Sequence, residues 1–219
     1  MRLGLGYVAV AALLFSVTHA EAGSAPGWYG SALVGYNIQQ DTELSFDATT
    51  KVKTDYKQGW IYGAALGREW GPVWFLGAVR NEYEISIRES LVNTHKVGGA
   101  TLTGSEGNIV STSGMVNLYN DFETDTRWVP YIGFGAGFSE VKFKNFRTQG
   151  LGTVLNDDDL VFAYQGMAGA TYALTNHISI AAEYRYFATE KPSLTSEANF
   201  TAPVEYTSHG LLARLNVRF

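Results

Sequence analysis

The sequence predicts an all-β protein in which eight antiparallel strands run up and down and close into a barrel that spans a membrane. Three observations support this prediction. Eight segments alternate apolar and polar residues, and each is longer than the ~5–6 residues of an average soluble strand. The connections between the segments alternate between long and short. The N-terminus has the composition of an export signal.

The composition permits this fold and excludes several other classes. The 219 residues are 46% hydrophobic, 14% aromatic and 17% charged, and 24 of them are glycine. Cysteine is absent, which excludes a disulfide framework and a thiolate metal site. The net charge of −5 argues against a nucleic-acid partner, which would require a basic surface.

Residues 1–22, MRLGLGYVAVAALLFSVTHAEA, have the organisation of a cleaved signal peptide. An early arginine precedes an apolar stretch, and the small residues Ala20 and Ala22 each suit the last position before cleavage. The apolar stretch is shorter than the ~20 residues of a spanning helix. We therefore expect residues 23–219 to form one outer-membrane barrel domain, with a buried N-terminal helix as the alternative to a signal.

Eight segments of the mature chain have strand character. Each exceeds the ~9–11 residues that a tilted strand needs to cross a bilayer. An even number of strands is also typical of single-chain bacterial barrels. In order, the segments are 27–39, 58–70, 73–87, 108–122, 128–142, 160–174, 177–189 and 206–219.

The connections between these segments sort by length. Long connections at 40–57, 88–107, 143–159 and 190–205 alternate with short ones at 71–72, 123–127 and 175–176. In outer-membrane barrels the long loops lie outside the cell and the tight turns lie in the periplasm, so we expect both termini on the periplasmic side. The long connections carry apolar residues among many Thr, Ser, Asn and Gly. These suit contact with a partner or with lipopolysaccharide, and they equally suit packing of the loops on one another.

Period-two alternation indicates which way the strands face. The third, fifth, seventh and eighth segments each have one apolar face and one face with charges or glycines, whereas the first, second and sixth are less regular. A soluble sandwich would turn the charged face to water. In a membrane the apolar face meets lipid and the charged face lines the interior. The predicted interior charges are Arg68, Arg80, Glu82, Asp121, Glu183, Arg185, Arg214 and Arg218.

Aromatic residues mark the expected membrane boundaries, where rings with a polar edge prefer to lie. The last nine residues, LLARLNVRF, place Phe219 in the periplasmic girdle and turn Arg214 and Arg218 inward. A lipid-facing arginine at mid-depth would cost ~2–4 kcal/mol. The boundary aromatics are Trp28, Trp70, Trp128, Tyr172, Tyr184, Tyr186 and Phe219.

Five stretches resemble one family: WYGSALVGY at 28–36, GMVNLYNDF at 114–122, PYIGFGAGFS at 130–139, AAEYRYF at 181–187 and the terminal NVRF. The family is that of the eight-stranded outer-membrane barrels of Gram-negative bacteria, of the OmpA-like transmembrane, opacity and surface-antigen type. The resemblance extends from about residue 27 to residue 219. It implies an outer-membrane location, surface-exposed loops and a terminal strand, ending in Phe219, that the barrel assembly machinery recognises. No peptidoglycan-binding domain follows residue 219, so we do not expect wall anchoring.

The resemblance leaves several functions open, because such barrels include structural anchors, adhesins, immune-evasion proteins and small channels. We expect a non-enzymatic surface protein that supports the envelope and contacts a host or environmental ligand through its loops. Its expected partners are outer-membrane lipids, lipopolysaccharide and the barrel assembly machinery, with no cofactor. A narrow passive channel for ions or small solutes is the first alternative, although side chains can fill an eight-stranded barrel.

A lipid A-modifying enzyme is the second alternative. His177 and Ser179 lie on one face of the seventh segment together with Glu183, and a His–Ser–acid set can activate a nucleophile. Some eight-stranded outer-membrane enzymes deacylate lipid A with a His-x-Ser pair. Here Glu183 would lie ~13 Å from Ser179 along the strand. His177 also follows a periplasmic turn, away from the outer leaflet, so packing or turn capping is favoured.

The remaining candidate ligands do not predict a metal site. The three consecutive carboxylates of Asp157, Asp158 and Asp159 lack the spaced ligand pattern of a calcium loop. His95 and His209 are isolated in the sequence and lack the spacing of a zinc site.

Overall fold

The computed structural model describes residues 26–40, 42–45, 51–73, 77–97, 100–102, 106–148, 152–190, 193–195, 201–203 and 206–219. The predicted signal peptide lies outside these residues. Every regular element among them is a β-strand. In this part of the chain no helix has the length and the apolar character that crossing a membrane requires.

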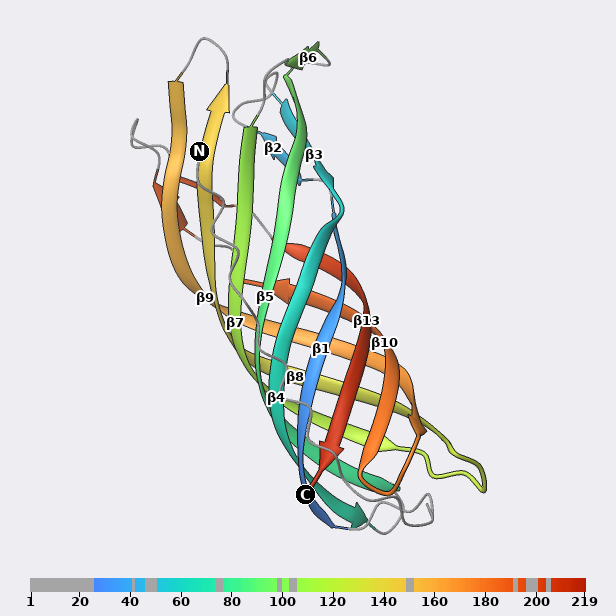
Figure 1. The fold of residues 1–219 in the computed structure, drawn as a ribbon. Coiled ribbons are helices and arrows are strands. Elements are labelled where there is room, and N and C mark those ends of the chain that lie inside the picture. Colours follow the sequence, from blue (N-terminus) through green and yellow to red (C-terminus); the bar gives the residue numbers. More distant parts are fainter. Residues whose placement is uncertain are drawn as a thin grey trace, which may run out of the picture.

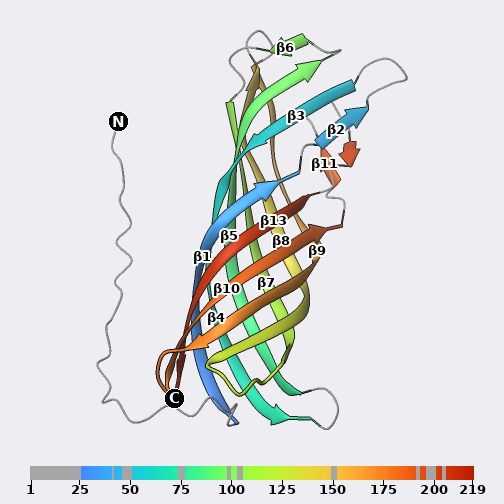
Figure 2. The same cartoon turned by 90° about the vertical axis from the view of Figure 1, so that its right-hand side faces the viewer.

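Eight strands close into a barrel in which all neighbouring pairs are antiparallel (Figures 1 and 2). Each strand pairs with the next one along the chain, and the last pairs with the first. Closure leaves the barrel without an unpaired edge, as a sheet in hydrocarbon requires. The predicted fold class is therefore confirmed. The strands are β1 (Gly27–Gln39), β4 (Gly59–Pro72), β5 (Ala78–Val97), β7 (Glu106–Asp121), β8 (Trp128–Thr148), β9 (Gly152–Ala173), β10 (Ile178–Thr189) and β13 (Thr207–Arg218).

The predicted turn at 71–72 is wrong. β4 continues through Gly71, and its register against β5 shifts between Glu69 and Gly71. Gly71 has a φ of 78°, so this glycine serves a bulge and not the turn that the Gly-Pro pair suggested. The chain reverses between Pro72 and Ala78, where the Val73 N–H donates to the Gly77 carbonyl at 2.8 Å.

Several barrel strands are longer than predicted, and β5, β8 and β9 are longer by five residues or more. β5, β7, β8 and β9 have 20, 16, 21 and 22 residues. The predicted long connections at 88–107 and 143–159 are therefore mostly strand. At ~3.3 Å per residue β9 follows a path of about 70 Å. That is more than twice the ~30 Å of a hydrocarbon core.

The long strands form a tall wall beyond one end of the barrel, while β1, β10 and β13 stop lower (Figure 1). We call the outer parts of β5, β7, β8 and β9 the extended wall and call this the loop end. The other end, where β1 begins, β13 ends and β4 connects to β5, β7 to β8 and β9 to β10, is the short-turn end. Short strands accompany the loop end: β2 (Thr42–Ser45), β3 (Lys51–Lys57), β6 (Ala100–Leu102), β11 (Ser193–Thr195) and β12 (Thr201–Pro203).

The two faces of the barrel strands differ as they do in lipid. Arg80, Glu82 and Arg214 on the inner face are at most 6% exposed, whereas Phe134 and Ile85 on the outer face are each 66% exposed. Polar side chains are thus buried and apolar ones exposed, which inverts the order of a soluble sandwich. Aromatic pairs occur on the outer face at both ends: Trp128 with Tyr172 and Tyr36 with Trp60.

Candidate functional site in the barrel interior

The barrel interior holds a cluster of ionised side chains that originates in the alternation of β5. Arg80, Glu82, Glu84 and Arg88 occupy every second position except 86, where Ser86 stands, so all point inward. Each of the four charged side chains is at most 6% exposed. Burial of this kind requires partners, because an unpaired charge in a low-dielectric interior is costly.

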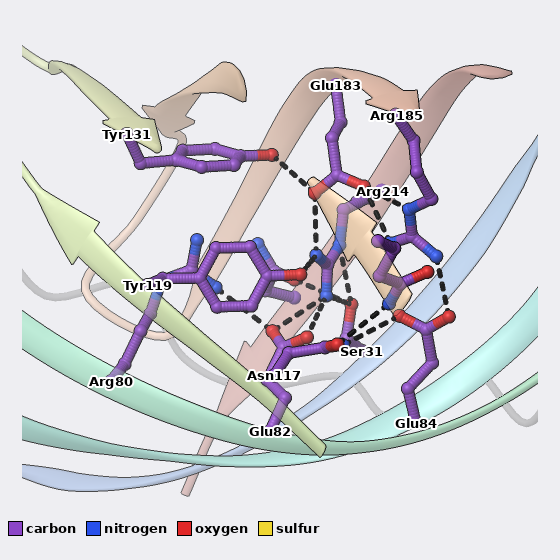
Figure 3. Close-up of polar contacts among 12 residues, drawn as sticks. Ser31, Arg80, Glu82, Glu84, Asn117, Tyr119, Tyr131, Glu183, Arg185 and Arg214 are labelled. Atoms are coloured by element: carbon purple, nitrogen blue, oxygen red, sulfur yellow. Dashed lines mark hydrogen bonds and ion pairs between the residues drawn. The ribbon is translucent and has the colours of Figure 1, made fainter. Parts of the chain in front are cut away.

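Arg214 of β13 is the centre of the cluster (Figure 3). Its Nη2 lies 2.7 Å from both carboxylate oxygens of Glu82. Its Nη1 donates to Glu183 Oε2 at 2.9 Å and to the Tyr119 hydroxyl at 2.8 Å. One guanidinium therefore joins β13 to β5, β7 and β10.

Arg185 of β10 makes the second set of contacts (Figure 3). Its Nη1 lies 2.6 Å from Glu84 Oε1, and its Nη2 lies 2.6 Å from Glu183 Oε1. The other oxygen of Glu84 accepts a hydrogen bond from Asn117 Nδ2 at 3.1 Å. Gln165 Nε2 in turn donates to Asn117 Oδ1 at 2.7 Å. The neutral amide of Asn117 thus donates to the Glu84 oxygen that Arg185 does not contact, and Gln165 in turn donates to Asn117.

Arg80 makes the third set of contacts, closer to the short-turn end. Its Nε donates to both oxygens of Asp121, at 3.0 and 2.9 Å, and its Nη1 donates to Glu82 Oε1 at 2.9 Å. Its guanidinium carbon lies 3.9 Å from the centroid of the Tyr119 ring. The Tyr29 hydroxyl donates to Glu82 Oε1 at 2.6 Å. Three arginines thus share four carboxylates, which leaves the cluster with one negative charge in excess.

Arg88 and Glu84 are interior charges that the sequence analysis did not include; it placed residue 88 at the start of a loop. The Arg88 side chain is fully buried and donates to Ser86, Ser113 and Gln165, with the guanidinium carbon 3.8 Å from the centroid of Phe187. No ion pair of Arg88 occurs among the residues that the structure describes. Its positive charge balances the excess of the cluster. Continued alternation along 80, 82, 84, 86 and 88 was the signal that could have revealed it.

Small inward residues make room for the large ones. A Cβ added to Gly133 would lie 2.4 Å from the Tyr119 ring, and one added to Gly135 would lie 2.0 Å from Asn117 Oδ1. The alternating glycines of β8 are therefore required by close approach of side chains from β7. An apolar cluster fills the interior towards the loop end: Ile109, Met115, Val141, Val161, Ala163, Phe187 and Tyr206.

The short-turn end of the interior is less completely filled. A cavity of about 90 Å³ lies there, with Asp121, Asn216 and Arg218 among its lining residues. Arg218 is partly exposed and pairs with Glu69 at this rim. Arg218 is therefore inward-facing but separate from the central cluster.

Six of the eight predicted interior charges meet in the central cluster, namely Arg80, Glu82, Asp121, Glu183, Arg185 and Arg214. The placement of Arg68 was wrong. Arg68 lies on the outer face, with its guanidinium carbon 4.3 Å from the Trp70 ring centroid and 5.5 Å from that of Trp28. Near a membrane interface an arginine can face outward at little cost, so its charge did not indicate an inward position.

The His–Ser–acid set does not assemble. His177 is exposed in the turn before β10. Ser179 Oγ accepts a hydrogen bond from Asn216 Nδ2 at 3.3 Å. Glu183 is held by Arg185, Arg214 and the Tyr131 hydroxyl. The acid of the set is therefore committed to the interior ion pairs.

Other predicted residues lie as follows. Phe219 is 74% exposed on the outer face, and its N–H donates to the Trp28 carbonyl at 3.0 Å. His209 lies between the rings of Tyr184 and Tyr186, and its Nδ1 is 2.6 Å from the Tyr184 hydroxyl oxygen.

Among the described parts of the chain no three His, Asp or Glu side chains gather as metal ligands would.

Comparison with known proteins relates this barrel to bacterial outer-membrane proteins. "Outer membrane protein PagN" of Salmonella typhimurium is 36% identical over 101 residues, which are 45% of this chain and 41% of that protein. An "Outer membrane protein" of Gluconacetobacter diazotrophicus is 27% identical over 208 residues, which cover 84% of this chain and 52% of that protein. The matched regions thus span about half of these relatives or less.

Solved structures show the same fold. Neisserial surface protein A superposes with a TM-score of 0.52 at 14% identity, over 88% of this chain and 97% of that chain. The outer membrane protease OmpT of Escherichia coli has a TM-score of 0.51 at 10% identity, over 94% of this chain and 99% of that chain. The family described as "Outer membrane protein beta-barrel domain" matches residues 7–219. The chain therefore belongs to this outer-membrane β-barrel family.

Proposed function

We propose that this protein is a non-enzymatic surface protein whose barrel anchors the extended wall, and that the wall contacts a host or environmental surface. The observation that carries the proposal is the length of β5, β8 and β9, at 20, 21 and 22 residues. A strand crosses a bilayer with ~9–11 residues. About half of each strand is therefore free to project beyond the membrane. The short turns belong in the periplasm, so the wall points away from the cell.

The interior supports a structural role for the barrel. Its ion pairs join strands that are not neighbours in the sheet, as Arg185 of β10 does with Glu84 of β5. Each central carboxylate has at least one arginine within 3.0 Å. A barrel of this size is filled by its own side chains. Such an interior suits a rigid anchor better than a solute path, which is the first alternative.

Hairpin removal tests the proposal. In one variant Ser90 is joined to Ile109, and Lys142 to Asp158, each through an Asn-Gly turn, because a two-residue hairpin connects directly paired residues. In a matched control Thr189 is joined to Tyr206 through the same Asn-Gly turn, which removes β11 and β12 but keeps the wall. Both variants should reach the outer membrane as heat-modifiable barrels, because the paired strands within the membrane are unchanged.

Attachment of cells that display each variant is then measured on cultured epithelial cells and on surfaces coated with collagen or laminin. We expect the wall deletion to abolish attachment on at least one of these surfaces and the control to retain it. Equal attachment by wild type and the wall deletion would refute the proposal. So would a change in the lipid A mass spectrum on expression of the wild type, which would indicate the second alternative, an enzyme.

A further inference from the structure

We propose that the outer face of this barrel binds one phospholipid of the leaflet at the short-turn end. Its phosphate would contact Arg68 and one acyl chain would lie in an alanine-lined hollow across β1, β13, β10 and β9. The proposal depends on the outer-membrane location of the barrel and is independent of the proposed surface contact. Two separate features carry it, the first cationic and the second apolar.

The cationic feature is Arg68 between two tryptophans. Trp28 lies directly opposite Arg68 in the β1–β4 pairing, and both Trp28 and Trp70 interact with the guanidinium through their rings. The Trp70 indole N–H donates to Asn81 Oδ1 at 2.7 Å, which fixes the ring. Arg68 makes no ion pair with any acidic side chain that the structure describes. A positioned cation on the lipid-facing surface thus has no counter-charge within the described part of the chain.

The chemistry of this arrangement matches a phosphate group. Tryptophans mark the depth of the headgroups. Stacking on rings leaves the N–H edge of a guanidinium available, and that planar edge fits two phosphate oxygens at once. A lipid headgroup is therefore the counter-charge that this depth of the membrane supplies.

The apolar feature begins beside Trp28. On the same face of β1 the next outward residues are Gly30 and Ala32. A Cβ added to Gly30 would meet no atom within 4 Å, so the surface is open there. Ala32 stands opposite Ala64 of β4. The distance from Trp28 to Ala32 along the strand is ~13 Å, which a lipid acyl chain spans.

Small residues continue this depression across the neighbouring strands. Ala182 of β10 pairs with Ala213 of β13 on one side and with Ala170 of β9 on the other. A hollow of about 700 Å³ lies over them. Larger side chains also line it: Val34, Trp128, Tyr172, Ile180 and Leu215. The hollow is continuous with the lipid-facing band, so a hydrocarbon chain is the occupant that fits it.

Native mass spectrometry of the full chain in detergent micelles tests the headgroup site. Phosphatidylglycerol is titrated against the wild type, Arg68→Gln and a matched control, Arg127→Gln, which removes an exposed arginine from a turn at the same end. We expect Arg68→Gln to weaken binding of the first lipid about tenfold, as the loss of a charge-assisted contact predicts. Arg127→Gln should bind like the wild type. Equal affinity of wild type and Arg68→Gln would overturn the proposal.

Filling the hollow tests the chain site. Ala213→Phe should reduce phosphatidylglycerol binding, whereas Ala168→Phe, an outward alanine that does not line the hollow, should not. The wild type should bind diacylglycerol with the same acyl chains more weakly than phosphatidylglycerol. Arg68→Gln should bind the two lipids with equal affinity. Equal binding of the two lipids by the wild type, or equal loss in both phenylalanine variants, would contradict a shared phosphate-and-chain site. Heat-modifiability of each variant confirms that the barrel is folded.

Discussion

Arg214 in the last strand meets Glu82 across the barrel interior, with Arg214 Nη2 2.7 Å from both carboxylate oxygens. Their strands, β13 and β5, are separated in the closed sheet by β1 and β4. The contact therefore crosses the interior and is not a cross-strand pair within one hairpin. It can form only when the end of the chain has closed the barrel, so this ion pair reports on closure.

The first prediction concerns this contact. Arg214→Leu leaves Glu82 and Glu183 each with one fewer arginine, and we expect it to destabilise the barrel by up to ~3–5 kcal/mol. Thr112→Leu, on the outer face of β7, is the control and should be neutral or stabilising. The measurement is the urea concentration at which the heat-modifiable gel shift is lost. If the Arg214→Leu barrel were more stable than the wild type, the interior ion pairs would not hold the barrel together.

The second prediction concerns the inward glycines of β8. Gly133→Val would drive a side chain into the Tyr119 ring, and overpacking of this kind costs ~1–3 kcal/mol. Gly114→Val is the matched control, because a Cβ there meets no atom within 4 Å and valine favours strands. Urea unfolding of the folded form compares the two. Similar stabilities would show that the interior can rearrange around residue 133.

The third prediction concerns the end of the chain. Phe219→Ala removes a ring that is 74% exposed on the outer face, so the folded barrel should lose little stability. If the terminal aromatic is an assembly signal, the variant should be depleted from the outer membrane and degraded in the periplasm. Purified Phe219→Ala should nevertheless fold into detergent at a near-normal yield. Wild-type levels in the membrane would exclude the signal role.

The fourth prediction concerns orientation and uses the absence of cysteine from the chain. Glu190→Cys places a thiol at an exposed position of the loop end, and Asp125→Cys places one in an exposed short turn. A membrane-impermeant maleimide on intact cells should label position 190 and leave position 125 unlabelled until the outer membrane is permeabilised. The reverse pattern would invert the orientation and place the extended wall in the periplasm.

The fifth prediction concerns solute passage. The interior ion pairs and the apolar cluster of Phe187 and Tyr206 fill the barrel, so the purified protein should show no stable large conductance in planar bilayers. Arg88→Ala removes the fully buried guanidinium beside Phe187. It is therefore the variant in which a path for solutes would open most readily. A reproducible nanosiemens channel from the wild-type monomer would favour the channel alternative.

The barrel was predictable from the sequence because the lipid acts on each strand separately. Any strand that crosses hydrocarbon must expose apolar side chains on one face, so alternation identifies it without knowledge of its neighbours. The faces of β10 and β13 follow from this rule, and the structure has them as predicted. The inward direction of Arg214 is part of the same pattern.

The outer halves of β8 and β9 and the position of Arg68 were not predicted, because lipid does not impose alternation outside the hydrocarbon core. The outer halves of β8 and β9 lie beyond the hydrocarbon, where a strand needs no apolar face, and they were interpreted as loops. Arg68 lies at the interface, where an outward charge costs ~0–1 kcal/mol and alternation is no longer enforced. The bulge at Gly71 was also hidden, since a Gly-Pro pair predicts a turn as readily as a bulge.

The sequence by itself determined that the chain forms a closed eight-stranded barrel and which side chains of its regular strands face inward. The tertiary structure alone decided which inward charges meet. Alternation assigns a side chain to a face but carries no information about what lies opposite across the interior. Glu82 finds Arg214 and Glu84 finds Arg185 only through the register and closure of the whole sheet. Arg88 forms no ion pair with the residues that the structure describes, and it acquires its role as the balancing charge from that same assembly.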